Sequence, residues 1–173
     1  MVSGWARRCV GRVTARRRPH VLRPLNRIAA VPGLALEEGQ TARRSATLTA
    51  EHVAMYAALS GDYNPLHFDE AFAAGTPFGQ LVVQGGLTTG LLHALVATDM
   101  PGPGTVFLSQ NWKFTAPVFV GDSITAEAVV KSVHDTKPVC QLAIRVSRSD
   151  GETVLEGEAW CYTFRPPEHT ASG

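Results

Sequence analysis

The sequence predicts a single α+β domain in which one antiparallel sheet packs against one long apolar helix. The chain has 173 residues, a length that suits one domain with a substantial hydrophobic core. One polar strand-like segment is followed by helical segments and then by four strand-like runs, an order typical of α+β domains. The most apolar helical segment, Gln84 to Ala97, is expected to be the helix that the sheet covers.

The charge of the chain is unevenly distributed. Eight arginines and no acidic residue precede Glu37, and the remaining 8 of the 16 Lys and Arg residues are outnumbered by 15 Asp and Glu residues. An Arg-rich, acid-free N-terminus is typical of mitochondrial import, so residues 1–35 are predicted to be a removable presequence. A basic arm for nucleic acid and an uncleaved tail on a cytosolic protein are the alternatives. Nothing downstream resembles a nucleic-acid motif, so we expect no nucleic-acid partner and an acidic mature chain.

The rest of the sequence shows no pattern that predicts a membrane span, a disulfide framework or a metal site. The longest apolar candidate for a span is interrupted by His93 and by glycines. Cys9 lies in the predicted presequence, whereas Cys140 and Cys161 lie in apolar strand-like runs and are expected to be small buried thiols. There is no CxxC pair and no tight His/Cys cluster, so we expect no metal.

The first elements of the domain are a strand and a helix. The polar segment from Glu37 to Thr49 is expected to form an edge strand. Thr49 is a good N-cap for the helix that follows, and Glu51 suits its first turn. This helix is expected to end at Ser60, because Gly61 is the residue type best able to leave a helix.

Asp62, Asn64 and His67 follow this helix in a segment with non-helical turn chemistry. Asn and Asp bond their own main chain, and Pro65 pushes Asn64 out of the helical region. An Asp carboxylate beside an imidazole can set the tautomer of the ring, or both groups can bind one water. The Asn64 amide can orient a water or a neighbouring carboxylate. The alternative interpretation is a capped turn whose side chains only satisfy backbone groups.

Two helical segments come next. Asp69 to Ala74 is expected to form a short helix that Gly75 and Pro77 terminate. The apolar helix then begins with Gly85 and Gly86, which leave uncovered N–H groups at the positive end of the helix dipole. A developing oxyanion would be stabilised there, although glycines at this place also permit close helix–sheet packing.

Four strand-like runs complete the domain. They are expected over Val106 to Phe114, Ser123 to Val133, Val139 to Ser147 and Val154 to Phe164, because apolar and polar residues alternate within them. Turns are predicted at Asp135 to Pro138 and at Ser149 to Gly151, and residues 166–173 are expected to form a flexible tail.

The motif Tyr-x-x-Leu-Ser-Gly-Asp-x-Asn-Pro-Leu-His, which begins at Tyr56, resembles the signature of the MaoC-like (R)-specific enoyl-thioester hydratases, the hydratase 2 group. The resemblance continues through Gly79 to Gly85, Pro101 to Gly104 and Trp112 to Asp122, and it covers roughly residues 36–165. It implies a hot-dog fold over these residues, in which the sheet wraps the central helix, and a homodimer.

The resemblance also implies a reaction. Water would add reversibly to a trans-2-enoyl thioester to give an (R)-3-hydroxyacyl thioester, without a metal or redox cofactor. Asp62 and His67 would share the proton transfers on a bound water, Asn64 would orient the pair, and the N–H of Gly85 would bind the thioester carbonyl. Substrate contacts are expected from Phe78 and Gly79, in the loop across the entrance, and from Gly86.

This chain departs from the family pattern at two positions. Gln84 stands where members commonly have His directly before the glycine of the central helix, and His93 stands where they often carry a small polar residue. A His on an apolar helix is more often a satisfied core residue than a catalyst, so His93 is expected in the core and outside the catalytic set.

Several functions are compatible with these patterns. A mitochondrial presequence combined with this activity points to the dehydration step of mitochondrial fatty acid synthesis, on an acyl-carrier-protein thioester. Hydration of an enoyl-coenzyme A thioester in the oxidative direction is the alternative, since an acidic chain does not favour an acidic carrier unless Arg43, Arg44 or Lys113 forms a basic patch. A non-catalytic acyl-thioester-binding module is a third interpretation. A hot-dog thioesterase is disfavoured because residues 85–98 contain no Asp or Glu.

Overall fold

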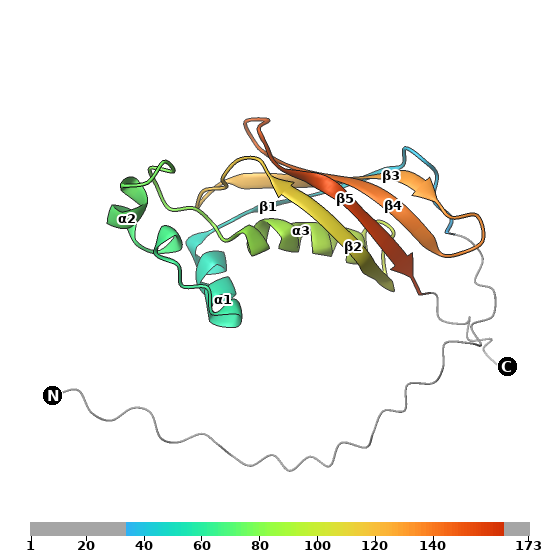
Figure 1. Ribbon diagram of the computed structural model, residues 1–173, viewed down its shortest axis with the longest axis horizontal. Helices are drawn as coiled ribbons and strands as arrows, with labels where there is room; N and C mark the ends of the chain where they lie inside the picture. The colour runs from blue at the N-terminus through green and yellow to red at the C-terminus, as the bar shows by residue number, and fades with distance from the viewer. Residues whose placement is uncertain (1–33, 165–173) are drawn as a thin grey trace, which may run out of the picture.

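The computed structural model describes residues 34–164 and shows one five-stranded antiparallel sheet with a helix across one face (Figure 1). The predicted presequence, apart from its last two residues, and the predicted tail lie outside the described residues. The elements in chain order are β1 (Thr41–Thr47), α1 (Ala50–Ser60), the 3₁₀ turn η1 (Pro65–His67), α2 (Glu70–Ala74), α3 (Gly85–Thr98), β2 (Thr105–Phe114), β3 (Ser123–Val133), β4 (Val139–Arg148) and β5 (Thr153–Thr163). The predicted α+β class is confirmed.

The strand order of the sheet is β1-β3-β4-β5-β2, so β1 and β2 form its two edges. The edge position predicted for the first strand is confirmed, although β1 starts at Thr41 because Gly39 turns the chain with a φ of 84°. The four later strands lie within one residue of their predicted bounds. Period-two alternation specifies such strands well, because a shift of one residue would expose the whole apolar face.

Helix α3 lies against the inner face of the sheet and supplies much of the core (Figure 1). Leu92, Leu95 and Val96 are buried between the helix and the strands. The sheet covers only one side of α3, so the opposite face of the helix is exposed. His93 lies on that exposed face, so its expected core position is wrong; its ring packs 5.1 Å from the ring of Phe107.

The two described cysteines are buried thiols, as predicted. Cys140 on β4 and Cys161 on β5 lie directly opposite each other and are both free and fully buried. The hydrogen bond between the two thiols, together with burial, raises the pKa of Cys161. Nothing at this pair favours a thiolate nucleophile at Cys161.

The outer face of the sheet carries a row of charges that alternates in sign from one edge to the other. Cross-strand register places Arg43 opposite Glu127, Glu127 opposite Arg145, Arg145 opposite Glu156, and Glu156 opposite Lys113. Opposite charges at paired positions stabilise a sheet, and Arg43 forms an ion pair with Glu127. Arg44 also pairs, with its Nε 2.8 Å from an Asp99 carboxylate oxygen. The predicted patch from Arg43, Arg44 or Lys113 is therefore interleaved with acidic residues.

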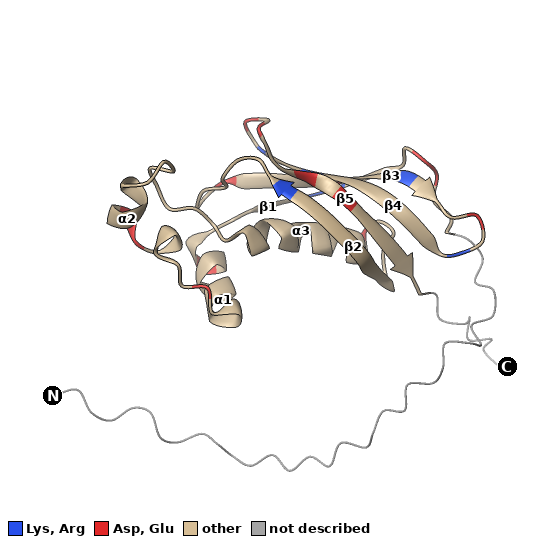
Figure 2. Ribbon diagram, viewed as in Figure 1, with Lys and Arg blue, Asp and Glu red and all other residues tan. Residues whose placement is uncertain are grey.

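Helices α1 and α2, with η1 between them, project beyond one end of the sheet (Figure 1). The predicted N-cap is confirmed, because the Thr49 hydroxyl accepts from the His52 N–H while the His52 ring accepts from the Thr49 N–H. The predicted C-cap is also confirmed, with Gly61 in the left-handed region at φ 80°. Figure 2 shows charged residues on the turns and on the sheet, whereas α3 carries none. Between residues 34 and 164, no helix is long and apolar enough to cross a membrane.

Candidate active site

The segment between α1 and α2 is held by its own turn chemistry. A carboxylate oxygen of Asp62 accepts from the Asn64 N–H at 3.3 Å, and the Asn64 side-chain oxygen accepts from the Leu66 N–H at 3.1 Å. Asn64 thereby caps η1, which Pro65 begins. The side-chain oxygen of Asn64 is thus engaged in the turn, while its backbone N–H orients the carboxylate of Asp62.

Asp62 and His67 are brought together at the end of this segment. His67 Nε2 lies 3.6 Å from a carboxylate oxygen of Asp62, a distance too long for a direct hydrogen bond. The imidazole side chain is only 10% exposed, whereas Asp62 is 43% exposed. Both groups therefore remain able to bind a common third molecule that approaches from the side of Asp62.

A backbone carbonyl sets the orientation of the His67 ring. The Nδ1 atom lies 2.7 Å from the carbonyl oxygen of Val82, an acceptor only, so Nδ1 carries the proton in this contact. In the neutral ring the lone pair is then on Nε2, the nitrogen that faces Asp62. The arrangement can take up a proton at Nε2 without rotating the ring.

A cavity of about 360 Å³ lies at the start of α3, and neither Asp62 nor His67 belongs to its wall. Val82 belongs to its wall, and so does Gly85, the first residue of α3. Helix geometry leaves the first N–H groups of α3 without intrahelical partners, and these groups form the positive end of the helix dipole. The full wall consists of Phe78, Val82, Val83, Gly85, Thr88, Phe114, Thr115, Ala116, Pro117 and Val118. The cavity is mostly apolar and can hold an aliphatic group beside a polarising helix end.

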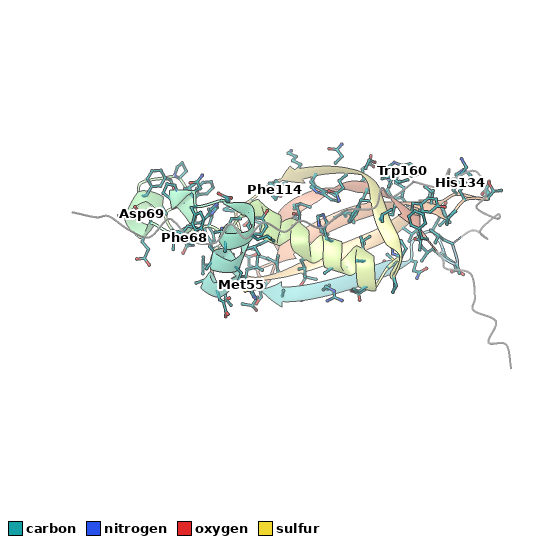
Figure 3. All side chains as sticks on the ribbon, turned by 90° about the horizontal axis from the view of Figure 1, so that it is seen from below. Met55, Phe68, Asp69, Phe114, His134 and Trp160 are labelled. Carbon is teal, nitrogen blue, oxygen red and sulfur yellow. The ribbon has the colours of Figure 1, made fainter. Side chains whose placement is uncertain are left out.

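The two glycines at the start of α3 have different neighbours. A Cβ on Gly85 would lie 3.1 Å from the ring of Phe114, which Figure 3 shows over the start of the helix. A Cβ on Gly86 would lie 1.9 Å from the hydroxyl oxygen of Tyr56 on α1. Gly86 therefore permits α1 and α3 to approach closely, whereas the helix–sheet packing that the sequence left open for the paired glycines occurs at Gly85, against Phe114 of β2.

Gln84 also joins these two helices. Its side chain is buried, and its Nε2 donates to the carbonyl oxygen of Val53 on α1 at 3.2 Å. Its Oε1 has no hydrogen-bond partner among the described residues. The Gln84 amide thus makes a hydrogen bond to α1 at the position where the family resemblance led us to expect an imidazole.

The structure brings together most, but not all, of the residues that the sequence singled out. Phe78 and Gly85 share the cavity wall, whereas Asp62 and His67 lie close to each other outside that wall, and His67 contacts it through the carbonyl of Val82. Gly79 and Gly86 lie outside that wall. Sequence reasoning missed Val82, which acts through its backbone, and Thr88, whose place three residues after Gly85 on the same helix was a usable signal.

Comparison with known proteins identifies the family. The MaoC-like domain model matches residues 33–151. The chain is 44% identical over 124 residues to an (R)-specific enoyl-CoA hydratase of Aeromonas caviae, an alignment that covers 72% of this chain and 92% of that protein. The chain belongs to the MaoC-like family. A more distant relative is the mitochondrial 3-hydroxyacyl-[acyl-carrier-protein] dehydratase of Solanum lycopersicum, at 32% identity over 72% of this chain and 75% of that protein.

The comparison of structures agrees with this assignment. The solved (R)-hydratase of A. caviae superposes with a TM-score of 0.72 at 42% identity, over 75% of this chain and 98% of that one. This MaoC-like protein therefore has the hot-dog fold predicted from the sequence, and it is an enzyme of the hydro-lyase class.

Proposed function

We propose that this MaoC-like protein catalyses the reversible removal of water from an (R)-3-hydroxyacyl thioester to give a trans-2-enoyl thioester. The observation that carries the proposal is the Asp62–His67 pair, in which Nδ1 of His67 is held by the carbonyl of Val82 and Nε2 faces the carboxylate. The names of the relatives, a hydratase and a dehydratase, describe the two directions of one such reaction.

In the hydration direction, the pair binds one water beside the β-carbon. The oxygen of the water forms a bond to C3 of the enoyl group, and a proton is delivered to C2, so that one water is added across the double bond. Of His67 and Asp62, one accepts a proton from the water, and the other begins protonated and donates its proton to C2. The accepted proton then returns to the donor, so that the pair regains its starting state and one whole water has been added. Asn64 supports the pair through the hydrogen bond from its N–H to Asp62.

Negative charge develops on the thioester oxygen when C3 is attacked. We place that oxygen at the start of α3, where the N–H of Gly85 donates to it and the helix dipole stabilises the enolate. The acyl chain then occupies the cavity of about 360 Å³ against Phe78, whereas Gly79 and Gly86, the other predicted substrate contacts, lie outside its wall. The thioester itself makes C2 acidic, so this scheme uses only side chains and backbone groups of the chain.

We propose the dehydration step of mitochondrial fatty acid synthesis as the biological role, with residues 1–35 as presequence and residues 36–165 as the catalytic domain. The Arg-rich N-terminus and the mitochondrial dehydratase of S. lycopersicum support it. A purified endogenous protein that retains the Arg-rich residues would exclude a cleaved presequence. Hydration of coenzyme A thioesters, as in the A. caviae enzyme, is the second candidate, since Arg43 and Arg44 are paired with acidic residues.

We further propose a homodimer. Strand β2 is an edge of the sheet, and it carries the exposed apolar side chains Val106, Leu108 and Phe114. Pairing with a second copy would cover both the free hydrogen-bonding edge and these side chains. Light scattering of the purified protein tests this, and a monomer mass at micromolar concentration would exclude it.

The test of the reaction is hydration of crotonyl-coenzyme A, followed by the loss of enoyl absorbance and by the stereochemistry of the product. Asp62→Asn and His67→Ala should each lower kcat by about 10²–10⁴-fold, the range for loss of a general acid or base. Matched controls are Asp135→Asn and His134→Ala in the exposed β3–β4 turn, which Figure 3 shows at the opposite end of the molecule.

Each outcome decides between the functions. An (R)-product that both site variants abolish and both controls retain supports the proposal. Turnover on acyl-carrier-protein thioesters but not on coenzyme A thioesters would assign the carrier. Binding of both substrates without turnover of either would refute the enzyme mechanism and favour the acyl-thioester-binding module.

A further inference from the structure

Arg148, the last residue of β4, is a nearly buried cation at a junction of two loops. Its side chain is only 14% exposed. Its Nη2 lies 2.9 Å from Asp150 and contacts Glu152, both in the β4–β5 turn, and the hydrogen bond with Asp150 raises the pKa of the guanidinium. Its Nη1 donates to the carbonyl oxygen of Pro117 at 2.9 Å, and its guanidinium lies 5.7 Å from the ring centroid of Phe119. Arg148 thus ties the β4–β5 turn to the segment between β2 and β3.

That segment, residues 115–122, contains no helix and no strand of the main sheet, so it depends on such ties for its position. Within it, the Phe119 N–H donates to Asp122 at 2.9 Å, and the same carboxylate oxygen lies 3.9 Å from Arg148 Nε. Four residues of the segment, Thr115 to Val118, belong to the cavity wall described above.

Residues 115–122 in turn contact Val82 and Val83, which lie shortly before α3 in the chain. The Val83 N–H donates to the carbonyl oxygen of Val118 at 2.9 Å, and Val82 forms an isolated antiparallel bridge with Phe119. Val82 is the residue whose carbonyl accepts the Nδ1 proton of His67. A direct contact therefore exists at every step from the Arg148 guanidinium to the imidazole.

We propose that Arg148 is a positioning residue for His67, acting through residues 115–122 and the carbonyl of Val82. Without the guanidinium, Pro117 and Phe119 lose their contacts with the β4–β5 turn, and the bridge at Val82 keeps only the backbone hydrogen bonds that residues 115–122 make with β5, Leu48 and Leu81. The carbonyl of Val82 is then no longer held in line with Nδ1, and the ring populates the other tautomer and other orientations. The consequence for catalysis rests on the proposed function, but the consequence for the imidazole does not.

The experiment compares Arg148→Met and Arg148→Lys with the parent protein, by the ¹⁵N–¹H NMR signal of the His67 Nδ1–H and by kcat and KM on crotonyl-coenzyme A. The signal is assigned by its absence in His67→Ala. Arg145→Met is the matched control, because Arg145 is an exposed arginine three residues earlier on the same strand and faces the outer charge row. Lysine at this position keeps the positive charge and can donate to the Pro117 carbonyl. Its single ammonium group cannot bind Pro117 and the carboxylates of the β4–β5 turn at the same time, as the planar guanidinium does.

In Arg148→Met we expect loss or strong broadening of the His67 Nδ1–H signal and a fall in kcat of about 10- to 100-fold, the effect of a misplaced catalytic group. Arg148→Lys should lie between Arg148→Met and the parent, and Arg145→Met should match the parent. An unchanged signal in folded Arg148→Met would overturn the proposal, even if KM rises because the cavity wall has moved. If Arg148→Met does not fold, an unchanged signal in Arg148→Lys does the same. A parent protein without turnover on either crotonyl-coenzyme A or the matching acyl-carrier-protein thioester would refute the proposed function and leave the NMR comparison valid.

Discussion

Replacement of Gly86 by Ala tests the close approach of α1 to α3. The added Cβ would lie 1.9 Å from the hydroxyl oxygen of Tyr56, 2.2 Å from its Cζ and 2.8 Å from its Cε2. These distances are far below the 3.5–4.0 Å optimum for contact between carbon atoms, so the Tyr56 ring or the whole of α1 must move. Overpacking of this kind costs about 1–3 kcal/mol, whereas Gly to Ala within a helix gains roughly 0.5–1 kcal/mol. We expect a net loss of about 1–2 kcal/mol.

The assay is urea unfolding at one protein concentration, since a dimer would make the midpoint depend on concentration. Gly90→Ala is the matched control on the same helix, because no atom of the described residues lies within 4 Å of its added Cβ. It should raise stability by roughly 0.5–1 kcal/mol. Activity should fall only in Gly86→Ala, because α1 leads into Asp62 and its displacement moves the carboxylate relative to Gly85.

A double-mutant cycle with Tyr56 tests the same clash. In a Tyr56→Ala background the clashing atoms are gone, so Gly86→Ala should no longer lower the free energy of unfolding. The coupling energy between the two substitutions should therefore be opposite in sign to the effect of Gly86→Ala alone. A Gly86→Ala protein as stable as its parent, with an unchanged urea m-value, would refute the clash. So would an equal loss of stability with and without the Tyr56 ring.

Two further predictions concern the core and the surface. Leu92→Ala should lower the free energy of unfolding by about 2–5 kcal/mol, because the side chain of Leu92 on α3 is fully buried. Leu59→Ala on α1, where the side chain is 86% exposed, should change the free energy of unfolding by less than about 0.5 kcal/mol. Urea unfolding of both variants measures the difference. The pKa of Asp99 is lowered in the folded protein because its carboxylate accepts hydrogen bonds from Arg44. The Asp99 carboxylate therefore binds a proton more tightly in the unfolded state than in the folded state, and the Arg44–Asp99 pair stabilises the fold only while Asp99 is ionised. That stability should be lost as the pH falls through the lowered pKa, and acid titration of Asp99→Asn should show a smaller loss over this interval than the parent; parallel titrations would contradict the assignment.

Local chemistry made much of the fold predictable. The bounds of β3 follow from period-two alternation, and the limits of α1 follow from the hydroxyl of Thr49 and the left-handed Gly61. Each of these signals depends on residues within a few positions of one another, so it can be recognised in the sequence without knowledge of the tertiary structure. The same holds for Asp62 and His67, which lie on one short segment that a proline and two turn side chains stiffen.

Other expectations failed or were incomplete because they depended on which surfaces meet. The leucine pattern of α3 predicted a helix with a broad apolar surface, but it could not show that the sheet covers one side only and leaves His93 exposed. The side chain of Asn64 was a candidate for orienting Asp62 and His67, yet its oxygen caps η1, and the contact with Asp62 comes from its backbone N–H.

The sequence by itself determined the order of the elements, the strand bounds and the identity of the Asp–His pair, since these depend on local propensity and on motif spacing. Tertiary structure alone decided which nitrogen of His67 faces Asp62, because the carbonyl of Val82 is 15 residues away and a backbone acceptor leaves no mark in a sequence. It also decided that Tyr56 occupies the space of a side chain at Gly86 and that Arg148 contacts the loop beside the cavity. Contacts of this kind arise only when distant segments pack together, and the free energy that specifies them is distributed over the whole core.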